Sequence, residues 1–409
     1  MPAGDAHAMT PTLPKARLTA FGALFFCYFA AVGSFNPFAP LWFKELGFST
    51  LAIGAIASLQ AWSRVLAPYA WSWWGDHGGR RTQLIRLAAL VSLVAALGLL
   101  WARGYVAVAT CTLLLFLANG GVVPLSEASL AQHLKTSTGI DSARYGRVRM
   151  WGSLGFISAV LMFGALLQAL GMAWFPVMVI GMYALLCVAS WRLPHATAER
   201  HDASQTPPVL SVLCRPEVAW FFASVFFTVL AHTAMYVFFS LYLDALGYSK
   251  TVVGLMWAAS VVAEIAFFWA QGHVFGGDSF WRDLFGRFEP QRWLQWAAAL
   301  SVLRFAMTAG MGAWWPALLF AQLLHAFTFA AQHASCIVLV NRFFPDALRG
   351  RGQALYTVVG YGATGVIGGV AGGWLVTRLD FAAVFWAAAV MALLGWGCAR
   401  AAGRHAHTA

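Results

Sequence analysis

The segment Leu41-Trp-Phe-Lys-Glu-Leu-Gly-Phe-Ser-Thr50 returns 200 positions later as Leu241-Tyr-Leu-Asp-Ala-Leu-Gly-Tyr-Ser-Lys250. The two leucines, the glycine and the serine are unchanged, and Gly54 likewise returns as Gly254. Each copy follows one long apolar run and precedes another. A similarity that is held at one fixed offset indicates that the chain consists of two equivalent halves.

The composition places both halves in a lipid bilayer. Of the 409 residues, 60% are hydrophobic and only 10% are charged, and the mean hydropathy is +0.70. A soluble domain carries about a quarter charged residues. Apolar runs of about 20 residues, the length of a membrane-spanning α-helix, recur along the sequence. We therefore expect an all-α polytopic membrane protein.

The apolar runs predict twelve transmembrane helices in two six-helix, pseudo-symmetric halves. We expect a tail at 1–17, halves at 18–193 and 217–400, a polar linker at 194–216 and a C-terminal tail at 401–409. The expected spans are Leu18–Phe43, Thr50–Trp74, Leu84–Trp101, Tyr105–His133, Val148–Leu170, Ala173–Trp191, Val218–Leu246, Val252–Val274, Leu294–Gly312, Trp315–Phe344, Ala354–Arg378 and Phe381–Ala399.

The basic residues predict the orientation. With both termini in the cytoplasm, 20 of the 26 Lys and Arg residues fall on cytoplasmic segments or the span ends beside them, and four fall outside. Basic residues collect on the cytoplasmic side of membrane proteins. The net charge of +11 is therefore better explained by topology than by nucleic-acid binding, and we expect a multi-pass protein of the inner membrane.

The loop after the second span is Gly75-Asp-His-Gly-Gly-Arg-Arg81. It resembles the G-x-x-x-D-x-x-G-R-R loop of the major facilitator superfamily, although Ser72 stands at the first glycine position. The resemblance implies the major facilitator fold, alternating access, and a loop that latches the two halves in one state. The alternative is an ordinary basic turn. The latch candidates are Asp76, Gly79, Arg80 and Arg81.

A narrower resemblance covers nearly the whole chain. Pro124-Leu-Ser-Glu127, Tyr145-Gly-Arg-Val-Arg-Met-Trp-Gly152, Val262-Ala-Glu264, Ser301-Val-Leu-Arg304 and Leu324-His325 are similar to motifs of the phenylpropionate permease family, which is related to lactose permease and to nucleoside:proton symporters. The resemblance implies that Glu127 and Arg149 contact substrate. It also implies that Arg304 and His325 belong to the proton-coupling group, although Thr328 stands where lactose permease has a glutamate.

Charged residues inside the spans are the most informative ones. Each costs about 2.5–3.5 kcal/mol at mid-membrane, so each should face a partner or a wet cavity. Arg64 and Glu264 occupy equivalent positions of the two halves, 200 residues apart. Three arginines against two glutamates leave one positive charge, which a substrate carboxylate would satisfy. The alternative is that some arginines snorkel to an interface. The five residues are Arg64, Glu127, Arg149, Glu264 and Arg304.

A carboxyl group withdrawn from water favours its protonated form, whereas a nearby arginine favours the charged form. Glu264 is therefore the first candidate for the proton carrier and Glu127 the second, with His325 as a relay. Four further residues are substrate-binding candidates: Trp151 and Phe156 as stacking aromatics, and His232 and Tyr236 because the resemblance implies that the seventh span borders the cavity. A lone membrane histidine is more often an interhelical hydrogen-bond partner.

These observations predict a proton-coupled symporter that imports a small organic solute, either an aromatic or other organic carboxylate such as 3-phenylpropionate, or a neutral oligosaccharide or nucleoside. We expect a functional monomer with substrate, proton and lipid as its partners. No cofactor beyond the proton gradient and no metal is expected, because the six cysteines form no ligand motif. An enzyme is not expected, because HExxH and recognisable nucleophile motifs are absent, and an ATP-driven importer would need a partner chain that carries a Walker A sequence.

Overall fold

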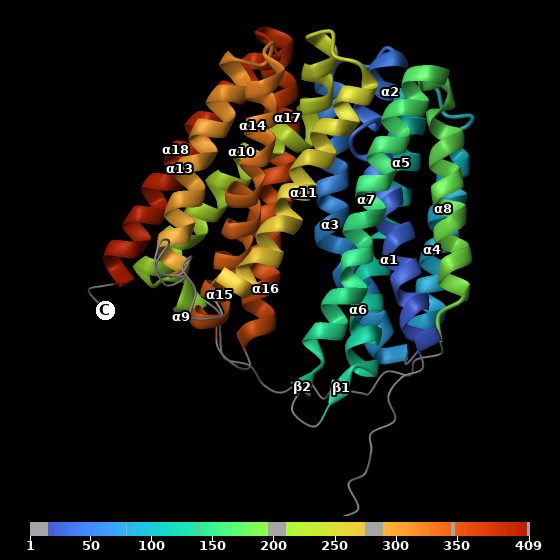
Figure 1. The fold of residues 1–409 in the computed structure, drawn as a ribbon, viewed down its shortest axis with the longest axis horizontal. Helices are drawn as coiled ribbons and strands as arrows, with labels where there is room; N and C mark the ends of the chain where they lie inside the picture. The colour runs from blue at the N-terminus through green and yellow to red at the C-terminus, as the bar shows by residue number, and fades with distance from the viewer. Residues whose placement is uncertain are drawn as a thin grey trace, which may run out of the picture.

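The computed structural model describes residues 15–78, 80–136, 139–194, 210–274, 289–344 and 348–406. The described chain is a bundle of long helices (Figure 1), which confirms the predicted all-α class. The first half contains α1 (Lys15–Phe35), α2 (Ala39–Glu45), α3 (Thr50–Gly78), α4 (Arg81–Gly98), α5 (Tyr105–Asn119), α6 (Val122–His133), α7 (Ser142–Leu170), η1 (Met172–Trp174) and α8 (Phe175–Trp191).

The second half repeats this pattern after the short helix α9 (Leu210–Leu213). Residues 195–209, most of the predicted linker, lie outside the described residues. The helices of the second half are α10 (Pro216–Ala245), α11 (Lys250–Val274), α13 (Pro290–Gly310), α14 (Trp315–Leu323), η2 (Ala326–Ala331), α15 (Gln332–Phe343), α16 (Arg349–Thr357), η4 (Val358–Ala363), α17 (Thr364–Arg378) and α18 (Phe381–Ala406).

Within the described part of the chain, eleven helices are long and apolar enough to cross a membrane. The predicted ninth span is the exception, although α13 is a continuous helix of 21 residues. Its hydropathy is low because Gln291, Arg292 and Gln295 stand near its start and Arg304 stands within it. The final helix α18 also continues past the predicted limit of the twelfth span, to Ala406.

Several spans are interrupted where the sequence pattern showed continuous helices. The first span bends between α1 and α2 at Asn36 and Pro37, where proline removes a backbone donor, and the fourth bends at Gly120 and Gly121. The tenth and eleventh spans contain the π-helical segments η2 and η4. Such segments are frequent at functional sites. A small antiparallel hairpin, β1 (Lys135–Thr136) with β2 (Gly139–Ile140), was not predicted.

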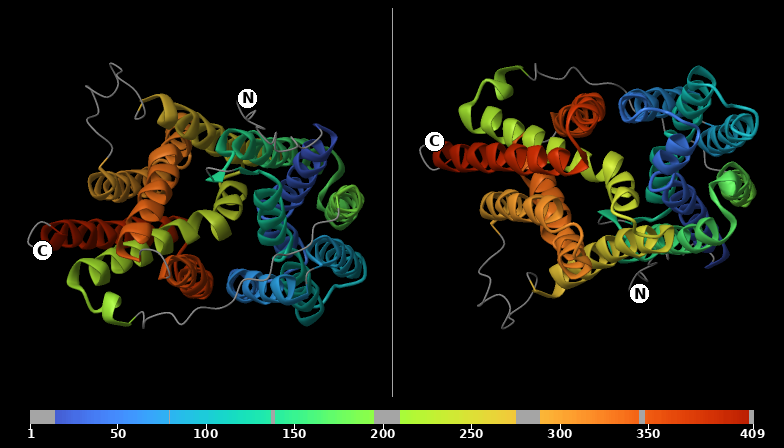
Figure 2. Two further views of the ribbon diagram at one scale, coloured as in Figure 1. Left: turned by 90° about the horizontal axis from the view of Figure 1, so that it is seen from below. Right: turned by 90° about the horizontal axis from the view of Figure 1, so that it is seen from above.

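The two halves stand side by side, one coloured blue to green and the other yellow-green to red (Figure 2). Helix α3 packs against α17 and α7 against α11. Glycines allow both contacts, because a side-chain carbon on Gly54 would collide with the carbonyl oxygen of Gly369, and one on Gly254 with that of Val160. Small residues of this kind let membrane helices approach closely.

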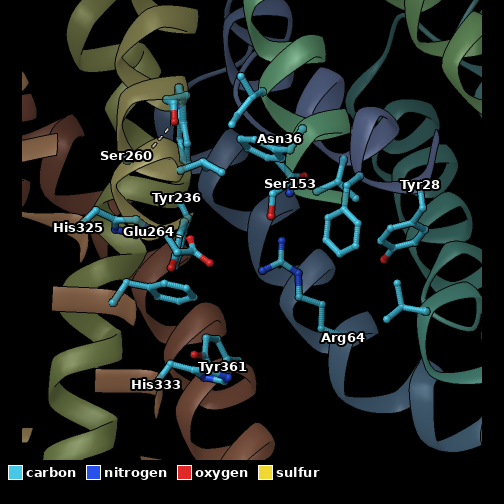
Figure 3. Close-up of a pocket in the computed structure, with 18 of the residues that line it drawn as sticks. Tyr28, Asn36, Arg64, Ser153, Tyr236, Ser260, Glu264, His325, His333 and Tyr361 are labelled. Atoms are coloured by element: carbon cyan, nitrogen blue, oxygen red, sulfur yellow. Dashed lines mark hydrogen bonds and ion pairs between the residues drawn. The ribbon is translucent and has the colours of Figure 1, made fainter. Parts of the chain in front are cut away.

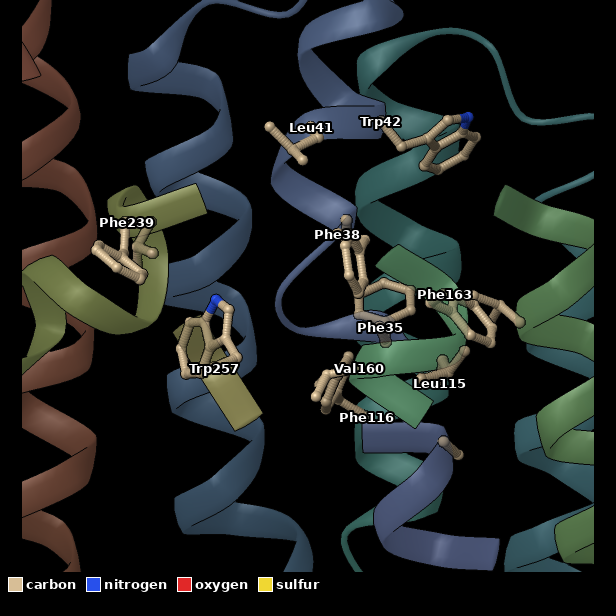
Figure 4. Close-up of a cluster of buried hydrophobic side chains, with 14 of the residues drawn as sticks. Phe35, Phe38, Leu41, Trp42, Leu115, Phe116, Val160, Phe163, Phe239 and Trp257 are labelled. Carbon is tan, nitrogen blue, oxygen red and sulfur yellow. The ribbon is translucent and has the colours of Figure 1, made fainter. Parts of the chain in front are cut away.

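The apolar core of the first half lies near the contact between α7 and α11 (Figure 4). The Phe35 ring is fully buried, with its centroid 5.3 Å from that of Phe116 and 5.7 Å from that of Phe175. This core fixes α1 against α5 and α8.

The start of α1 and the end of α18 lie at the same end of the bundle, which we call the termini end (Figure 1). The opposite end, at which α2 and α10 finish, is called the closed end.

Candidate functional site

A cavity of about 1560 Å³ lies between the two halves. Its walls come from α1, α3, α5 and α7 of the first half and from α10, α11 and the spans that contain η2 and η4 of the second. Figure 3 shows the polar residues that converge on it. This volume exceeds that of a drug-sized ligand pocket, about 300–1,000 Å³, so the cavity can hold a small solute together with water.

Contacts between the halves shut the cavity at the closed end. The Lys44 ammonium lies 2.7 Å from the Asp244 carboxylate. The Ser58 hydroxyl donates to the carbonyl oxygen of Val366 at 2.8 Å, and the Lys250 backbone N–H donates to the Gln168 side chain at 2.9 Å. At the other end, the lining residues Arg147, Met150 and Trp269 are exposed. The structure therefore has its cavity open toward the termini end.

Arg64 and Glu264 face one another across the cavity, as the repeat predicts. Both line it, and Figure 3 shows their side chains extending toward each other from α3 and α11. They lie beyond ion-pair distance, and Arg64 forms no ion pair with any carboxylate of the described chain. Arg64 is thus a cation in the cavity that no carboxylate of the described ranges neutralises.

Glu264 is connected to a buried polar group behind the cavity wall. The His325 Nε2 atom lies 3.7 Å from the Glu264 carboxylate. On the other side of the ring, Arg304 Nη1 donates to His325 Nδ1 at 2.9 Å. The Arg304 guanidinium also donates to the Thr328 hydroxyl at 2.9 Å and to the Gln322 amide oxygen at 3.2 Å.

These contacts define the protonation of His325. A guanidinium only donates hydrogen bonds, so Nδ1 of His325 accepts and carries no proton. The neutral ring therefore has its proton on Nε2, which points at Glu264. A second proton on His325 would break its bond to Arg304, whereas Glu264 has oxygen atoms facing the cavity. Glu264 is accordingly the better proton acceptor of the two.

Arg304 itself is 1% exposed and lies behind the cavity wall. It has three neutral acceptors and forms no ion pair with a carboxylate of the described residues. Thr328, at the position where the family resemblance implies a carboxyl group, supplies one of these acceptors. Arg304 is therefore a fixed buried cation that orients His325.

Arg149 and Glu127 form an internal pair at 3.2 Å between Nε and Oε1. Arg149 lines the cavity from α7, whereas Glu127 on α6 is not among the residues that line it. The guanidinium also stacks over the Phe29 ring at 4.3 Å, a cation–π contact. Arg64 and Arg304 both remain without a carboxylate partner among the described residues, and of these two only Arg64 lines the cavity.

The aromatic candidates separate into two groups. Phe156 lines the cavity, with its ring 6.5 Å from that of Trp257, and Tyr236 lines it from α10. Trp151 does not line the cavity, because it is 50% exposed and its ring packs on Gly22 and beside Phe26 of α1. The expectation that Trp151 reaches the cavity is therefore corrected: its position on α7 turns it away from the site.

His232 is buried behind the wall rather than in it. Its Nδ1 atom donates to the carbonyl oxygen of Thr228 at 2.8 Å, and its ring contacts Phe305.

The predicted latch is described in part: Arg80 precedes α4 and Arg81 begins it. Gly79 and the side chain of Asp76 lie outside the described residues, so the latch stays a prediction.

Sequence reasoning missed several lining residues: Tyr28, Ser153, Trp257, Ser260 and Tyr361. Nothing in the sequence separates them from aromatic and small polar residues that pack between helices. Asn36 and Asn119 also line the cavity, and their Oδ1 atoms are buried without a donor. Both stand at the helix interruptions of the first and fourth spans, and the sequence signal that marks them is an amide side chain within an apolar run.

Comparisons with known proteins show the family of the chain. The model of the MFS_1 like family matches residues 18–387. The chain is 29% identical over 393 residues to the probable 3-phenylpropionic acid transporter of Escherichia coli strain K12, with 93% of this chain and 96% of that protein covered. It is 28% identical over 388 residues to the maltose permease of Geobacillus stearothermophilus, with 93% of each covered.

Among solved structures, the nucleoside transporter NupG superposes with a TM-score of 0.77 at 16% identity, covering 95% of this chain and 99% of that one. A mutant form of the same transporter gives a TM-score of 0.79 at 17% identity with the same coverage. At this identity the likeness is one of fold, and it confirms the predicted twelve-helix architecture of two halves.

Proposed function

The chain belongs to the MFS_1 like family and is a multi-pass membrane transporter, and from this premise we propose that it imports a small organic carboxylate together with a proton. The substrate class includes aromatic acids such as 3-phenylpropionate. The proposal places the termini end in the cytoplasm of the inner membrane, in keeping with the basic residues of that end, and takes the monomer as the functional unit.

The single observation that carries the proposal is Arg64. A guanidinium inside the membrane region without an anionic partner needs one, because an uncompensated charge there is expensive. The Arg64 guanidinium lies in the cavity where a solute can reach it. A carboxylate would accept two parallel hydrogen bonds from its planar fork. The related E. coli protein, described as a probable 3-phenylpropionic acid transporter, supports this substrate class.

Proton coupling is assigned to Glu264. The carboxyl group lies in the same cavity as Arg64 and is hydrogen-bonded by no arginine or lysine of the described chain. When the substrate carboxylate occupies Arg64, a charged Glu264 would face a second anion. Protonation removes that repulsion. Substrate and proton therefore favour one another's binding, which is the requirement for symport.

Alternating access follows from the two ends of the cavity. The contacts at the closed end and the open termini end define one state, and rocking of the halves about the central site gives the other. In the proposed cycle the loaded carrier closes at the termini end as it opens at the closed end. The latch residues Asp76, Gly79, Arg80 and Arg81 would hold one of these states.

The test is counterflow in proteoliposomes with 3-phenylpropionate, maltose and uridine side by side. Arg64→Gln should abolish 3-phenylpropionate exchange. Arg147→Gln is the matched control, because Arg147 lines the same cavity near its exposed mouth. Unchanged carboxylate exchange by the Arg64 variant would refute the assignment.

A second candidate is a neutral oligosaccharide or nucleoside with a proton. Asn36 and Asn119 favour it, because their buried amide oxygens could accept hydrogen bonds from sugar hydroxyl groups. The similarity to maltose permease is consistent with this candidate. In the same assay this candidate predicts counterflow of maltose or uridine that survives Arg64→Gln and is lost in Asn119→Ala.

A further inference from the structure

Opposite faces of α11 border the same cavity. Glu264 points into it, yet Val262 and Ala266 also line it. Each of these two residues lies about 160° around the helix from Glu264, at about 100° per residue. A single helix can present opposite faces to one cavity only where the cavity passes beside the helix to its outer side.

Helix α7 shows the same pattern. Leu154 lines the cavity although it lies about 140° around the helix from Arg149. Val160 and Gly164, which meet α11 at Gly254, lie about 20° and 60° from Arg149 in the same rotational sense. Leu154 therefore lies on α7 beyond the face that contacts α11.

On α11 too, the cavity lining continues past the side that contacts α7. Gly254, its contact residue with α7, lies about 80° around the axis from Glu264, and Trp269 lies about 140° in the same sense. On both helices the cavity thus continues past the seam where α7 and α11 meet. The two helices touch near the closed end and diverge toward the termini end (Figure 1). Leu154 and Val262, which line the cavity, lie past the contact of Val160 with Gly254 and so in the diverging part, where we infer the opening.

The rim of this opening is apolar. The exposed fractions of Leu154 and Val262 are 39% and 51%. In a chain that spans the membrane, apolar side chains exposed on the outer flank of the helices face lipid hydrocarbon. The cavity therefore connects a guanidinium, Arg64, with the bilayer through an apolar passage.

We propose that this passage between α7 and α11 admits the apolar part of an amphipathic carboxylate whose head is held at Arg64. The inference rests on the proposed function and narrows its substrate class to acids with an extended apolar tail. The occupant is an acid rather than the acyl chain of a phospholipid, because the inner end of the passage offers a cation, and an acyl chain whose headgroup stays at the membrane surface brings no anion to it. The tail reaches the half of the bilayer at the termini end.

The test is direct binding of radiolabelled butanoate, 3-phenylpropionate, octanoate and dodecanoate to the purified chain in lipid nanodiscs, corrected with nanodiscs that lack protein. Each additional methylene that leaves water should tighten binding by about fourfold. Val262→Trp narrows the passage and should weaken dodecanoate at least tenfold while changing butanoate less than twofold.

Leu255→Trp is the matched control. Leu255 is on the same helix with the same 51% exposed fraction, and it does not line the cavity, so this variant should change neither acid. Arg64→Gln should weaken all four acids together, and neutral methyl dodecanoate should not compete with dodecanoate.

The outcomes separate the two proposals. Affinity that is independent of tail length, or equal effects of the two tryptophan variants, would overturn the passage and leave carboxylate transport standing. If methyl dodecanoate competes as strongly as the acid, the passage holds a lipid chain. That result would also overturn the proposal that it holds the tail of a carboxylate. Absence of saturable binding for every acid would remove the proposed function and the passage together.

Discussion

Lys44 and Asp244 occupy the same position of the two repeated segments, and their charged groups meet at 2.7 Å between the halves. The pair links the end of α2 to the end of α10 at the closed end. It is partly exposed, with side-chain exposed fractions of 48% and 28%. Its contribution is therefore about 0.2–1 kcal/mol, as for other surface ion pairs.

Lys44→Asp should shift the carrier toward the state that is open at this end, because two carboxylates would then repel. For a pair of this strength we expect a roughly two- to fivefold faster reaction of a cysteine at Ile53, a buried cavity residue, with an impermeant maleimide added from the closed end. Combining Lys44→Asp with Asp244→Lys should return the rate to that of the parent. Failure of the exchanged pair to do so would show that the charges do not act on each other.

Glu264→Gln should abolish accumulation of substrate against a gradient and preserve counterflow, because the amide cannot bind and release the proton. Its exchange rate should lose the dependence on pH that the parent shows. The measurement is uptake with and without an imposed proton gradient in proteoliposomes. Glu217→Gln, in the first turn of α10 and outside the cavity lining, is the control. Proton-driven accumulation by Glu264→Gln would exclude this residue as the carrier.

Gly254→Leu should hold the carrier open at the closed end, because a side chain there collides with the backbone of Val160. Net uptake should fall at least tenfold while substrate binding remains. Gly181→Leu on α8, where an added side-chain carbon meets no atom within 4 Å, should transport normally. Equal transport by both variants would show that close packing of α7 and α11 is not required for the cycle.

Thr328→Val should destabilise the protein, because one Arg304 N–H would lose its acceptor in a buried site. We expect a loss of about 1–3 kcal/mol, measured as a lower unfolding temperature of the purified protein. Thr308→Val is the control: Thr308 is equally buried, but its hydroxyl only donates to the carbonyl oxygen of Arg304 within its own helix. Equal unfolding temperatures for the two variants would contradict the role given to Thr328.

Phe156→Ala should weaken binding of an aromatic acid by about twofold to tenfold, in the range of an aromatic contact of about 0.5–1.5 kcal/mol. Trp151→Ala should leave it unchanged, because its ring packs on α1 outside the cavity. Competition binding with 3-phenylpropionate compares the two variants directly. An effect of Trp151 larger than that of Phe156 would contradict the placement of these side chains.

Hydropathy predicted the membrane-spanning helices, and the internal repeat predicted which residues of the two halves face each other. Span lengths follow from the apolar runs, and the fixed offset placed Arg64 and Glu264 on opposite walls of one space before any coordinates. The offset could do so because equivalent positions of two halves that pack face to face lie across their common axis. Membership of the family was predictable from a different signal, the loop at 75–81 and the motifs around Glu127, Arg149, Glu264 and Arg304.

Other features depend on rotation about helix axes, which hydropathy does not report. Trp151 and Phe156 are five residues apart, and only their directions around α7 separate an outward ring from a lining one. His232 was a substrate-binding candidate and instead lies behind the cavity wall, whereas Arg304, expected in the proton-coupling group, is buried beside His325 and Thr328. The interruptions at Asn36 and Gly120 were hidden because proline and glycine pairs also occur in uninterrupted membrane helices.

Opposite charges stand at two sets of equivalent positions, Lys44 with Asp244 and Arg64 with Glu264, and this has a consequence for how such a chain can be assembled. In a dimer of identical subunits, a residue beside the twofold axis meets its own copy. Lysine would then face lysine and glutamate would face glutamate, so neither pair could exist. Joining the halves in one polypeptide removes this restriction, and each half can specialise in one sign of charge. The asymmetry that could distinguish an anionic cargo from a proton is therefore available only to the fused form.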